Sequence, residues 1–427
     1  MAKAEVIERL NPAKSLPIIT YNVPFPETCV KHIKETLNCS RPFIIVSGSL
    51  SRNTDALQRL QSALGEGNVA GVRAGMQPHT LYSEVLEISK EIKKSGADSV
   101  ITLGGGSLID GAKAMVFMIA NDVFTFDEMD PLFKESMVHR SAPEGQPPSH
   151  NLKASTIPII SVTTTLSAGE YNYAGGATND VTKHKQLFVD PIRSGPSVIV
   201  LDPELTLTTP ERVWLSTGLR AVDHCVETIC SSNHKPEGTV YSLHGIKLLI
   251  PALLQTKKDP KDPEARLKAQ LGGAQSMKAH LLEGANLDIG GSHGIGHQLG
   301  PIGVPHAETT CVCLPAVQKY NAKVNSEQQS KVLAALWGEP DAAEVLRKHS
   351  LVEGKADLGD ALDAIIRELG FPRSLKAYGI GRDKLDQIAQ SSVGDICCKW
   401  NAIPLEKPEQ VLEILEMCLE DAKEEKA

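Results

Sequence analysis

Three histidines near the middle of the chain have the spacing of a chemical site. His293 and His297 are four residues apart, so on a helix their imidazoles lie one turn apart on the same face. Gly300 and Pro301 end such a helix, and a short loop can then bring His306 back over that face. Imidazoles grouped in this way are typical of a metal site or a proton-handling site. The alternative is three histidines that never meet, and the spacing favours the cluster.

A glycine turn earlier in the chain predicts a phosphate site. The segment SVITLGGGSLIDGAKA, residues 99–114, has the pattern of strand, turn and helix. Glycines let the backbone approach a ligand, and free N–H groups at a helix start attract a pyrophosphate; the alternative is an ordinary tight turn. Asp110 suits such a site only if it points along the cofactor toward nicotinamide and substrate. The residues expected to hold the pyrophosphate are Gly104, Gly105, Gly106 and Ser107.

Hydroxyl side chains follow another expected strand. Thr163, Thr164 and Ser167 come directly after the apolar run Ile157–Val162. In an open parallel sheet, the carboxyl ends of the strands face the ligand crevice. We therefore expect this hydroxyl-rich segment to face the crevice, whereas the alternative is a Ser/Thr turn that caps the next element.

The elements that must position these residues alternate up to about residue 202. Helical patterns cover Thr54–Leu64 and Thr80–Ser95, between short apolar runs typical of strands buried on both faces. This alternation predicts an α/β domain with a mostly parallel sheet. The strand candidates are Pro42–Val46, Val69–Arg73, Ser99–Leu103, Ile157–Val162, Gln186–Val189 and Val198–Leu201.

Beyond this region the pattern becomes helical, which predicts an all-α second domain. Two domains are expected, residues 1–203 and 204–427, with a polar, Pro-rich loop at Asp130–Leu152. The expected helices of the second domain are Glu211–Ser231, Thr239–Leu254, Pro263–Leu287, Ser326–Trp337, Leu358–Leu369 and Pro408–Lys423.

Composition excludes several classes of function. The 427 residues carry a net charge of −8, which argues against the basic face that binds nucleic acid. The sequence contains no apolar run long enough to cross a membrane, and its N-terminus lacks the apolar stretch of a secretory signal. Nine cysteines, an odd number without a C-x-x-C pair, indicate reduced thiols. We expect a cytoplasmic enzyme that acts on a small molecule.

Together these motifs resemble the iron-type alcohol dehydrogenase superfamily, especially its maleylacetate-reductase-like branch. The resemblance spans most of residues 40–320. It implies a dinucleotide-binding α/β domain, an all-helical domain, an active site in the cleft between them, and commonly a homodimer. The motifs that carry it are GGGSLIDGAKA at 104–114, TTTLSAGE at 163–170, SVIVLDPELTLTTP at 197–210, STGLRAVDHCVE at 216–227 and SHGIGHQLGPIGVPHAET at 292–309.

The resemblance also implies roles for particular residues. His224, His293 and His306 match three metal-binding histidines of the metal-dependent members, and His297 matches an additional histidine near the catalytic centre. Those members carry an aspartate four residues before the first histidine, where this chain has Arg220. A guanidinium repels a dication, so loss of iron or zinc is the preferred interpretation. Asp223 is the alternative: it can substitute as a ligand, pair with Arg220 or orient an imidazole.

The cofactor is expected to be NADPH or NADH. The resemblance implies that it is lined by the hydroxyls of Thr163, Thr164 and Ser167. Many members carry an acidic residue after the strand Phe43–Val46, where it binds the adenosine ribose and selects NAD. Here that segment contains Ser49 and Arg52 and no carboxylate, so it can accept a 2′-phosphate. The alternative is that Arg52 is only the solvated start of a helix.

The resulting hypothesis is an NAD(P)H-dependent reductase of a carbonyl or electron-poor double bond. Arg220 is expected to bind a carboxylate of the substrate, and His293 or His297 to donate the proton. Three alternatives remain: a metal-dependent alcohol dehydrogenase, a cofactor-binding homologue without redox activity, and a lyase on the same fold.

Overall fold

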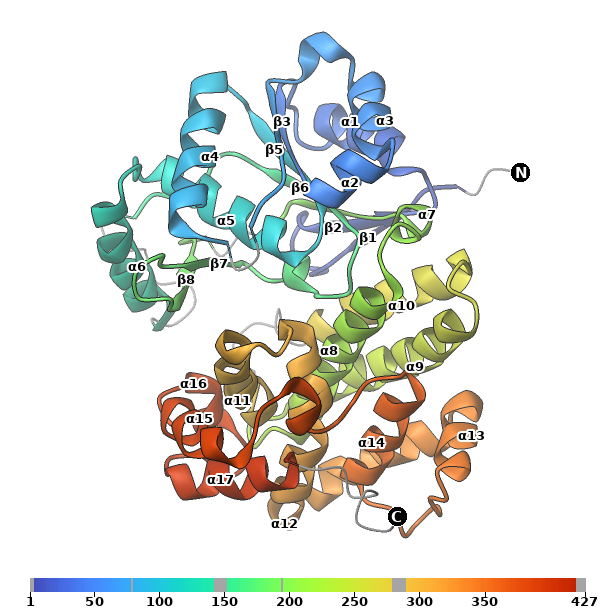
Figure 1. The fold of residues 1–427 in the computed structure, drawn as a ribbon. Helices are drawn as coiled ribbons and strands as arrows, with labels where there is room; N and C mark the ends of the chain where they lie inside the picture. The colour runs from blue at the N-terminus through green and yellow to red at the C-terminus, as the bar shows by residue number, and fades with distance from the viewer. Residues whose placement is uncertain (1–3, 78–79, 142–151, 193–194, 279–288, 420–427) are drawn as a thin grey trace. The chain divides into compact units, whose positions relative to one another are not determined.

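The computed structural model describes residues 4–77, 80–141, 152–192, 195–278 and 289–419 (Figure 1). The chain divides into two compact units, Met1–Thr209 and Pro210–Ala427. None of the described helices is long and apolar enough to cross a membrane.

The first unit is built on a seven-stranded sheet with the order β1-β2-β9-β6-β5-β3-β4. All neighbouring strands are parallel except β1 and β2, which are antiparallel. This confirms the mostly parallel sheet expected from the sequence. The strands are β1 (Val6–Arg9), β2 (Ile18–Tyr21), β3 (Pro42–Val46), β4 (Gly71–Ala74), β5 (Ser99–Gly104), β6 (Ile159–Thr163) and β9 (Val198–Leu201).

Helices cover both faces of this sheet, which is why its central strands are apolar throughout. Ile44 and Val46 of β3 pack on the side of α1 (Phe25–Glu35) and α3 (Ala56–Leu64). Phe43 and Ile45 alternate to the opposite face. There α4 (Tyr82–Ser95), α5 (Gly106–Ala120) and α6 (Phe126–Ser141) supply the apolar partners. Each fully buried side chain of this size contributes about 1.5–3 kcal/mol.

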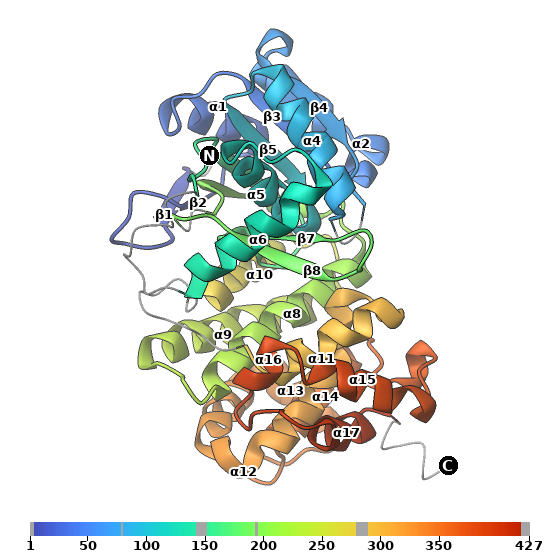
Figure 2. The same ribbon diagram turned by 90° about the vertical axis from the view of Figure 1, so that its left-hand side faces the viewer.

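Two expectations for this unit need correction. A loop was expected over Asp130–Leu152, but α6 occupies its first part, because Met129 and Leu132 are buried in the core; residues 142–151 lie outside the described part of the chain. The strand expected at Gln186–Val189 forms, but it is β8 (Lys185–Val189), which pairs antiparallel with β7 (Ala174–Thr178) in a separate two-stranded sheet. This hairpin and α6 lie side by side (Figure 2), where Phe133 meets Phe188 edge to face.

The described part of the second unit consists of helices joined by turns and loops and contains no strand, as expected. Asn325 is non-helical, so α12 is two helices joined at a kink, and the second is the helix predicted over Ser326–Trp337. The first, which begins at Thr309, was not expected. The helix predicted to reach Leu287 is described only to Lys278, and the helix predicted to reach Lys423 ends earlier, at Met417, with Cys418 as its C-cap. The helices are α8 (Glu211–Cys230), α9 (Pro236–Lys258), α10 (Pro263–Lys278), α11 (Gly291–Leu299), α12 (Thr309–Trp337), α13 (Pro340–Lys348), α14 (Leu358–Glu368), α15 (Leu385–Ser392), α16 (Ile396–Trp400) and α17 (Pro408–Met417).

Candidate active site

The glycine turn lies at the point where the strand order of the first unit reverses. From β3 the chain moves outward to β4 and then returns to place β5 on the other side of β3. The amide of Ser47, after β3, donates to the carbonyl of Leu103 at the end of β5, at 2.9 Å. Ligands of open α/β sheets bind at such a reversal, outside the carboxyl ends of the strands. The expected turn thus lies at the kind of position where open α/β sheets bind ligands.

The three glycines of this turn lie so close to neighbouring side chains that a Cβ at any of them would be crowded. A Cβ on Gly105 would come within 3.1 Å of Thr165 Cγ2, and one on Gly106 within 3.2 Å of Ser167 Cβ. The glycine turn and the loop after β6 can therefore lie this close together only because Gly105 and Gly106 carry no side chain. Ser107 follows in the first turn of α5, as expected.

Substitution of Gly104 by alanine is expected to damage this turn. Gly104 has a φ of 155°, and a Cβ there would lie 3.0 Å from the Cβ of Ser47. We expect a loss of about 1–3 kcal/mol in the free energy of unfolding and an increased KM for NAD(P)H. Denaturant unfolding and steady-state kinetics measure the two effects. Gly67→Ala is the matched control, because nothing lies within 4 Å of its added Cβ; equal effects of both substitutions would contradict this account.

The expected hydroxyl residues have unequal positions. Thr163 and Thr164 are buried. The Thr163 hydroxyl donates to the Thr165 carbonyl at 3.0 Å, and the Thr164 amide donates to the carbonyl of Gly104 at 3.1 Å. These two residues therefore fix the loop, while the Ser167 hydroxyl lies against Gly106 and is the one nearest the turn.

The segment expected to bind the adenosine ribose forms the short helix α2 (Gly48–Asn53). Ser47 caps this helix, and its hydroxyl lies 3.4 Å from that of Ser49. Arg52 is exposed, and its guanidinium folds back toward Gly48, where an added Cβ would lie 2.9 Å from Nη1. A hydroxyl and a guanidinium therefore lie on the helix that follows β3.

Asp110 already has two cationic partners within the first unit. Its carboxylate oxygens lie 3.1 Å from Lys113 Nζ and 3.0 Å from Lys185 Nζ. Burial acts to raise the pKa of Asp110, but the two ammonium charges outweigh it and lower the pKa. The buried Lys113 also donates to the carbonyls of Gly169 and Asn172. These contacts link α5 to the loop after β6 and to β8.

Glu170, for which the sequence suggested no role, lies buried next to this cluster. Burial raises its pKa to about 7, against the opposing effects of hydrogen bonds from its own amide and from Thr163 and of the charge of Lys113. Its Oε2 atom has no hydrogen-bond partner among the described residues. Its position in the TTTLSAGE motif is the only sequence signal that could have identified it.

The histidines of the second unit meet as expected. His224 on α8 stacks on His293 of α11 with ring centroids 5.0 Å apart. His297, one turn further along α11, lies 6.5 Å from the His293 ring and 6.4 Å from the ring of His306. The four imidazoles thus form one row in the order 224, 293, 297, 306. The alternative of separate histidines is excluded.

Arg220 and two carboxylates of α8 surround one end of this row. Arg220 Nη1 donates to the Thr310 hydroxyl at 2.9 Å and lies 3.5 Å from Asp223 Oδ2. The same Asp223 oxygen accepts from the hydroxyls of Ser292 and Thr310 and lies 3.4 Å from His293 Nδ1. Asp223 therefore both pairs with Arg220 and lies next to an imidazole.

Glu227 is the principal residue of this site that the sequence did not identify. It accepts hydrogen bonds from the amides of Gly290 and Ser292 at 3.0 and 2.8 Å, and one oxygen lies 2.6 Å from His293 Nδ1. Burial and the charge of Asp223 raise the pKa of Glu227, and burial together with the charge of Arg220 lowers the pKa of His293. Both shifts favour an uncharged pair. Glu227 lies seven residues after Arg220 on the same helix, and this spacing could have identified it from the sequence.

The metal-binding set expected from the resemblance does not fit these residues. Among the described residues, two groups of three potential ligand atoms lie within 4.8 Å of one another: Asp223, Glu227 and His293, and His297, Asp395 and Cys397. The set of His224, His293 and His306 is not one of them. The first group is buried beside the Arg220 guanidinium, so a dication there would meet a fixed positive charge.

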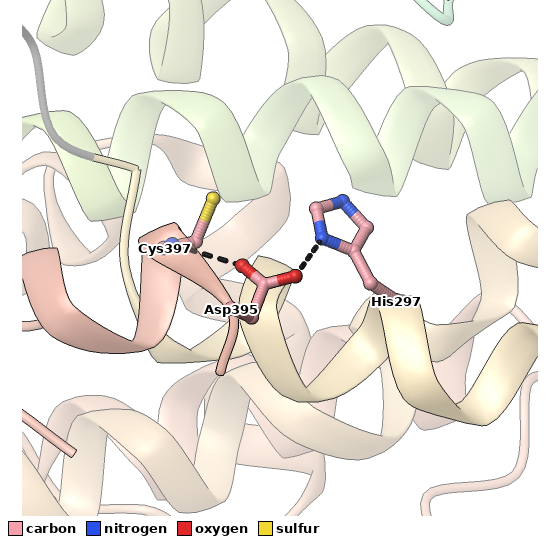
Figure 3. Close-up of side chains that lie close together, drawn as sticks. All are labelled: His297, Asp395 and Cys397. Carbon is pink, nitrogen blue, oxygen red and sulfur yellow. Dashed lines mark hydrogen bonds and ion pairs between the residues drawn. The ribbon is translucent and has the colours of Figure 1, made fainter. Parts of the chain in front are cut away.

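The more exposed part of the site lies at His297. Its side chain is 39% exposed, and its Nδ1 lies 2.9 Å from Asp395 Oδ2. The other oxygen of Asp395 accepts from the amide of Cys397 at 2.9 Å and so caps α16 (Figure 3). Asp395 was not expected from the sequence, because it is 98 residues from His297 and follows no recognisable motif.

A glycine turn at the reversal of a parallel sheet and a row of imidazoles are typical of an NAD(P)-dependent oxidoreductase. Residues 22–203 match the family described as iron-containing alcohol dehydrogenase, and residues 214–419 match its C-terminal domain. The chain belongs to the iron-containing alcohol dehydrogenase family, which confirms the resemblance seen in the sequence.

Two relatives are similar over most of the chain. Dehydrogenase FUM7 of Gibberella moniliformis is 37% identical over 424 residues, covering 95% of this chain and 97% of that protein. Dehydrogenase ALT3 of Alternaria alternata is 38% identical over 393 residues, covering 88% and 98%. Among solved structures, maleylacetate reductase from Agrobacterium tumefaciens has the same fold, with a TM-score of 0.72 and 23% identity over 94% of this chain and 95% of that one.

Proposed function

We propose that this enzyme is a metal-independent NAD(P)H-dependent reductase of small substrates that carry a carboxylate next to an electron-poor C=C or C=O bond. The observation that supports this most strongly is the environment of Arg220. Only Nη1 of its guanidinium makes hydrogen bonds or an ion pair with described residues. Nε and Nη2 thus remain available as donors, which is the geometry that binds a carboxylate in a bidentate way.

The roles of the other residues follow from their contacts. Hydride comes from the nicotinamide of a dinucleotide held at the glycine turn, with Ser49 and Arg52 able to accept a 2′-phosphate of NADPH. Negative charge that develops on the substrate is stabilised by Arg220. His297 is suited to deliver the proton, since it is partly exposed and its Nδ1 is held by Asp395. His293 is the alternative donor, and Glu227 fixes its Nδ1.

Elemental analysis of protein purified without chelator, combined with NADPH and NADH oxidation assays, tests the proposal. We expect far less than one iron or zinc per chain in active enzyme. We also expect turnover of 2-enoates or oxo-acids that exceeds turnover of their methyl esters. Stoichiometric metal whose removal abolishes activity would instead support the metal-dependent alcohol dehydrogenase. Cofactor binding without oxidation by any carbonyl or alkene would support the non-redox homologue or the lyase.

A further inference from the structure

His297, Asp395 and Cys397 form a compact group of three chemically different metal ligands (Figure 3). One nitrogen, one carboxylate oxygen and one sulfur all lie within 4.8 Å of one another. The Cys397 thiol and the His297 ring stand on the same side of the Asp395 carboxylate. The group is not deeply buried: His297 is exposed, and Asp395 and Cys397 are half-buried.

The group is also held in place before any ligand binds. Asp395 joins the other two members, since one oxygen contacts His297 Nδ1 and the other accepts from the Cys397 amide. A histidine nitrogen and a carboxylate oxygen, each about 2.1 Å from a tetrahedral zinc ion, are about 3.4 Å apart. The 2.9 Å separation of His297 Nδ1 and Asp395 Oδ2 therefore needs to open by only about half an ångström.

We propose that these three side chains bind Zn²⁺, a site separate from the iron position of the family. Zinc takes the place of the proton between His297 Nδ1 and Asp395 Oδ2, and the imidazole carries its proton on Nε2 instead. The Cys397 thiol loses its proton to solvent, so one proton is released for each zinc bound. A water molecule fills the fourth position, and the thiolate favours zinc over Mg²⁺ or Ca²⁺.

Occupation of this site has a consequence for catalysis, and this part of the inference rests on the proposed function. His297 lies between His293 and His306 in the imidazole row. Zinc on its Nδ1 removes the hydrogen bond to Asp395 and adds positive charge next to the row. With zinc on Nδ1 and a proton on Nε2, the ring has no free nitrogen and cannot form the imidazolium that donates a proton, so zinc inhibits the reductase.

The test uses Cd²⁺ as a spectroscopic probe and Zn²⁺ as ligand and inhibitor, each added to the full-length protein. A thiolate-to-cadmium charge-transfer band is expected to saturate at one ion per chain and to disappear in Cys397→Ser. Zinc affinity is expected to fall by more than about 100-fold in Cys397→Ser and in Asp395→Asn, because loss of a direct ligand exceeds the 10–100-fold effect of losing an outer partner. Cys39→Ser, another half-buried thiol, is the control and should bind as wild type.

Two outcomes would overturn the inference. One is a cadmium–thiolate band that persists in Cys397→Ser, and the other is zinc affinity that is unchanged in both variants. Inhibition is read separately: zinc should inhibit NADPH oxidation by wild type and by Cys39→Ser but not by Cys397→Ser. If the protein has no reductase activity, the proposed function fails while the cadmium band still decides whether the metal site exists.

Discussion

Replacement of Arg220 by glutamine is expected to lower kcat/KM for a carboxylated substrate by about 100-fold or more. Hydrogen bonds to charged groups contribute about 1.5–3 kcal/mol each, and a guanidinium supplies two of them to a carboxylate. Glutamine removes the charge and the fork of donors but retains an amide that can still contact the Thr310 hydroxyl. Steady-state kinetics with NADPH and a 2-enoate or oxo-acid measure the effect.

The methyl ester of the same substrate is the control for this experiment. Because the ester lacks the charge that Arg220 binds, its turnover should change by only a small factor in Arg220→Gln. Arg220→Lys keeps the positive charge but loses the planar fork of donors. Its kcat/KM for the carboxylated substrate should therefore lie between the values of wild type and Arg220→Gln. An equal loss for acid and ester would show that Arg220 supports the structure of the site through Asp223 and does not bind the substrate.

Replacement of Glu227 by alanine is expected to destabilise the second unit by about 3–6 kcal/mol. The change leaves three buried groups without an acceptor: the amides of Gly290 and Ser292 and Nδ1 of His293. Each unsatisfied buried group costs about 1–3 kcal/mol, and the cavity adds to the loss. Denaturant unfolding monitored by circular dichroism measures the change.

Two further variants give this prediction its controls. Glu211→Ala removes an exposed glutamate from the same helix, where its ion pair with Lys257 contributes about 0–1 kcal/mol. Glu227→Gln keeps the shape and two hydrogen-bonding atoms, so its loss should be clearly smaller than that of Glu227→Ala. A loss below about 1 kcal/mol in Glu227→Ala would contradict the role given to Glu227 as the residue that fixes His293.

The parts of the fold that the sequence predicted are those whose burial is uniform. The strand β3 is apolar along its whole length because helices cover both of its faces, and its runs of Phe, Ile and Val indicate this directly. The helix α6 was not predicted because it carries Pro131 and many polar residues, so the apolar residues of its buried face, among them Met129, Leu132 and Phe133, do not stand out as a helical pattern. The sheet to which β8 belongs is set by its pairing with β7, and the local sequence pattern of a strand does not specify its partner.

In the site, too, the contacts between residues close in sequence could be predicted, and those between distant segments could not. The pairing of His293 and His297 follows from their spacing on one helix, and the glycine turn follows from its motif. Asp395 and Cys397 reach His297 from a segment about a hundred residues away, so no spacing rule connects them. Glu227 was within reach of helical spacing, but carboxylates at i+3 and i+7 from an arginine are usually solvated and rarely suggest a buried network.

The place of β2 in the sheet has a consequence for the way the protein is made. β2 pairs with β9, joining Ile18 to Val198 across 180 residues. A ribosome that adds 5–20 residues per second needs roughly 10–40 s to produce that partner. During this interval the β1–β2 hairpin exposes unpaired backbone groups to other chains, and the edge of β6 that later receives β9 does so once β6 has been made. The nascent first unit is therefore most prone to aggregation before Val198–Leu201 emerges, and it becomes protected when that short strand closes the sheet.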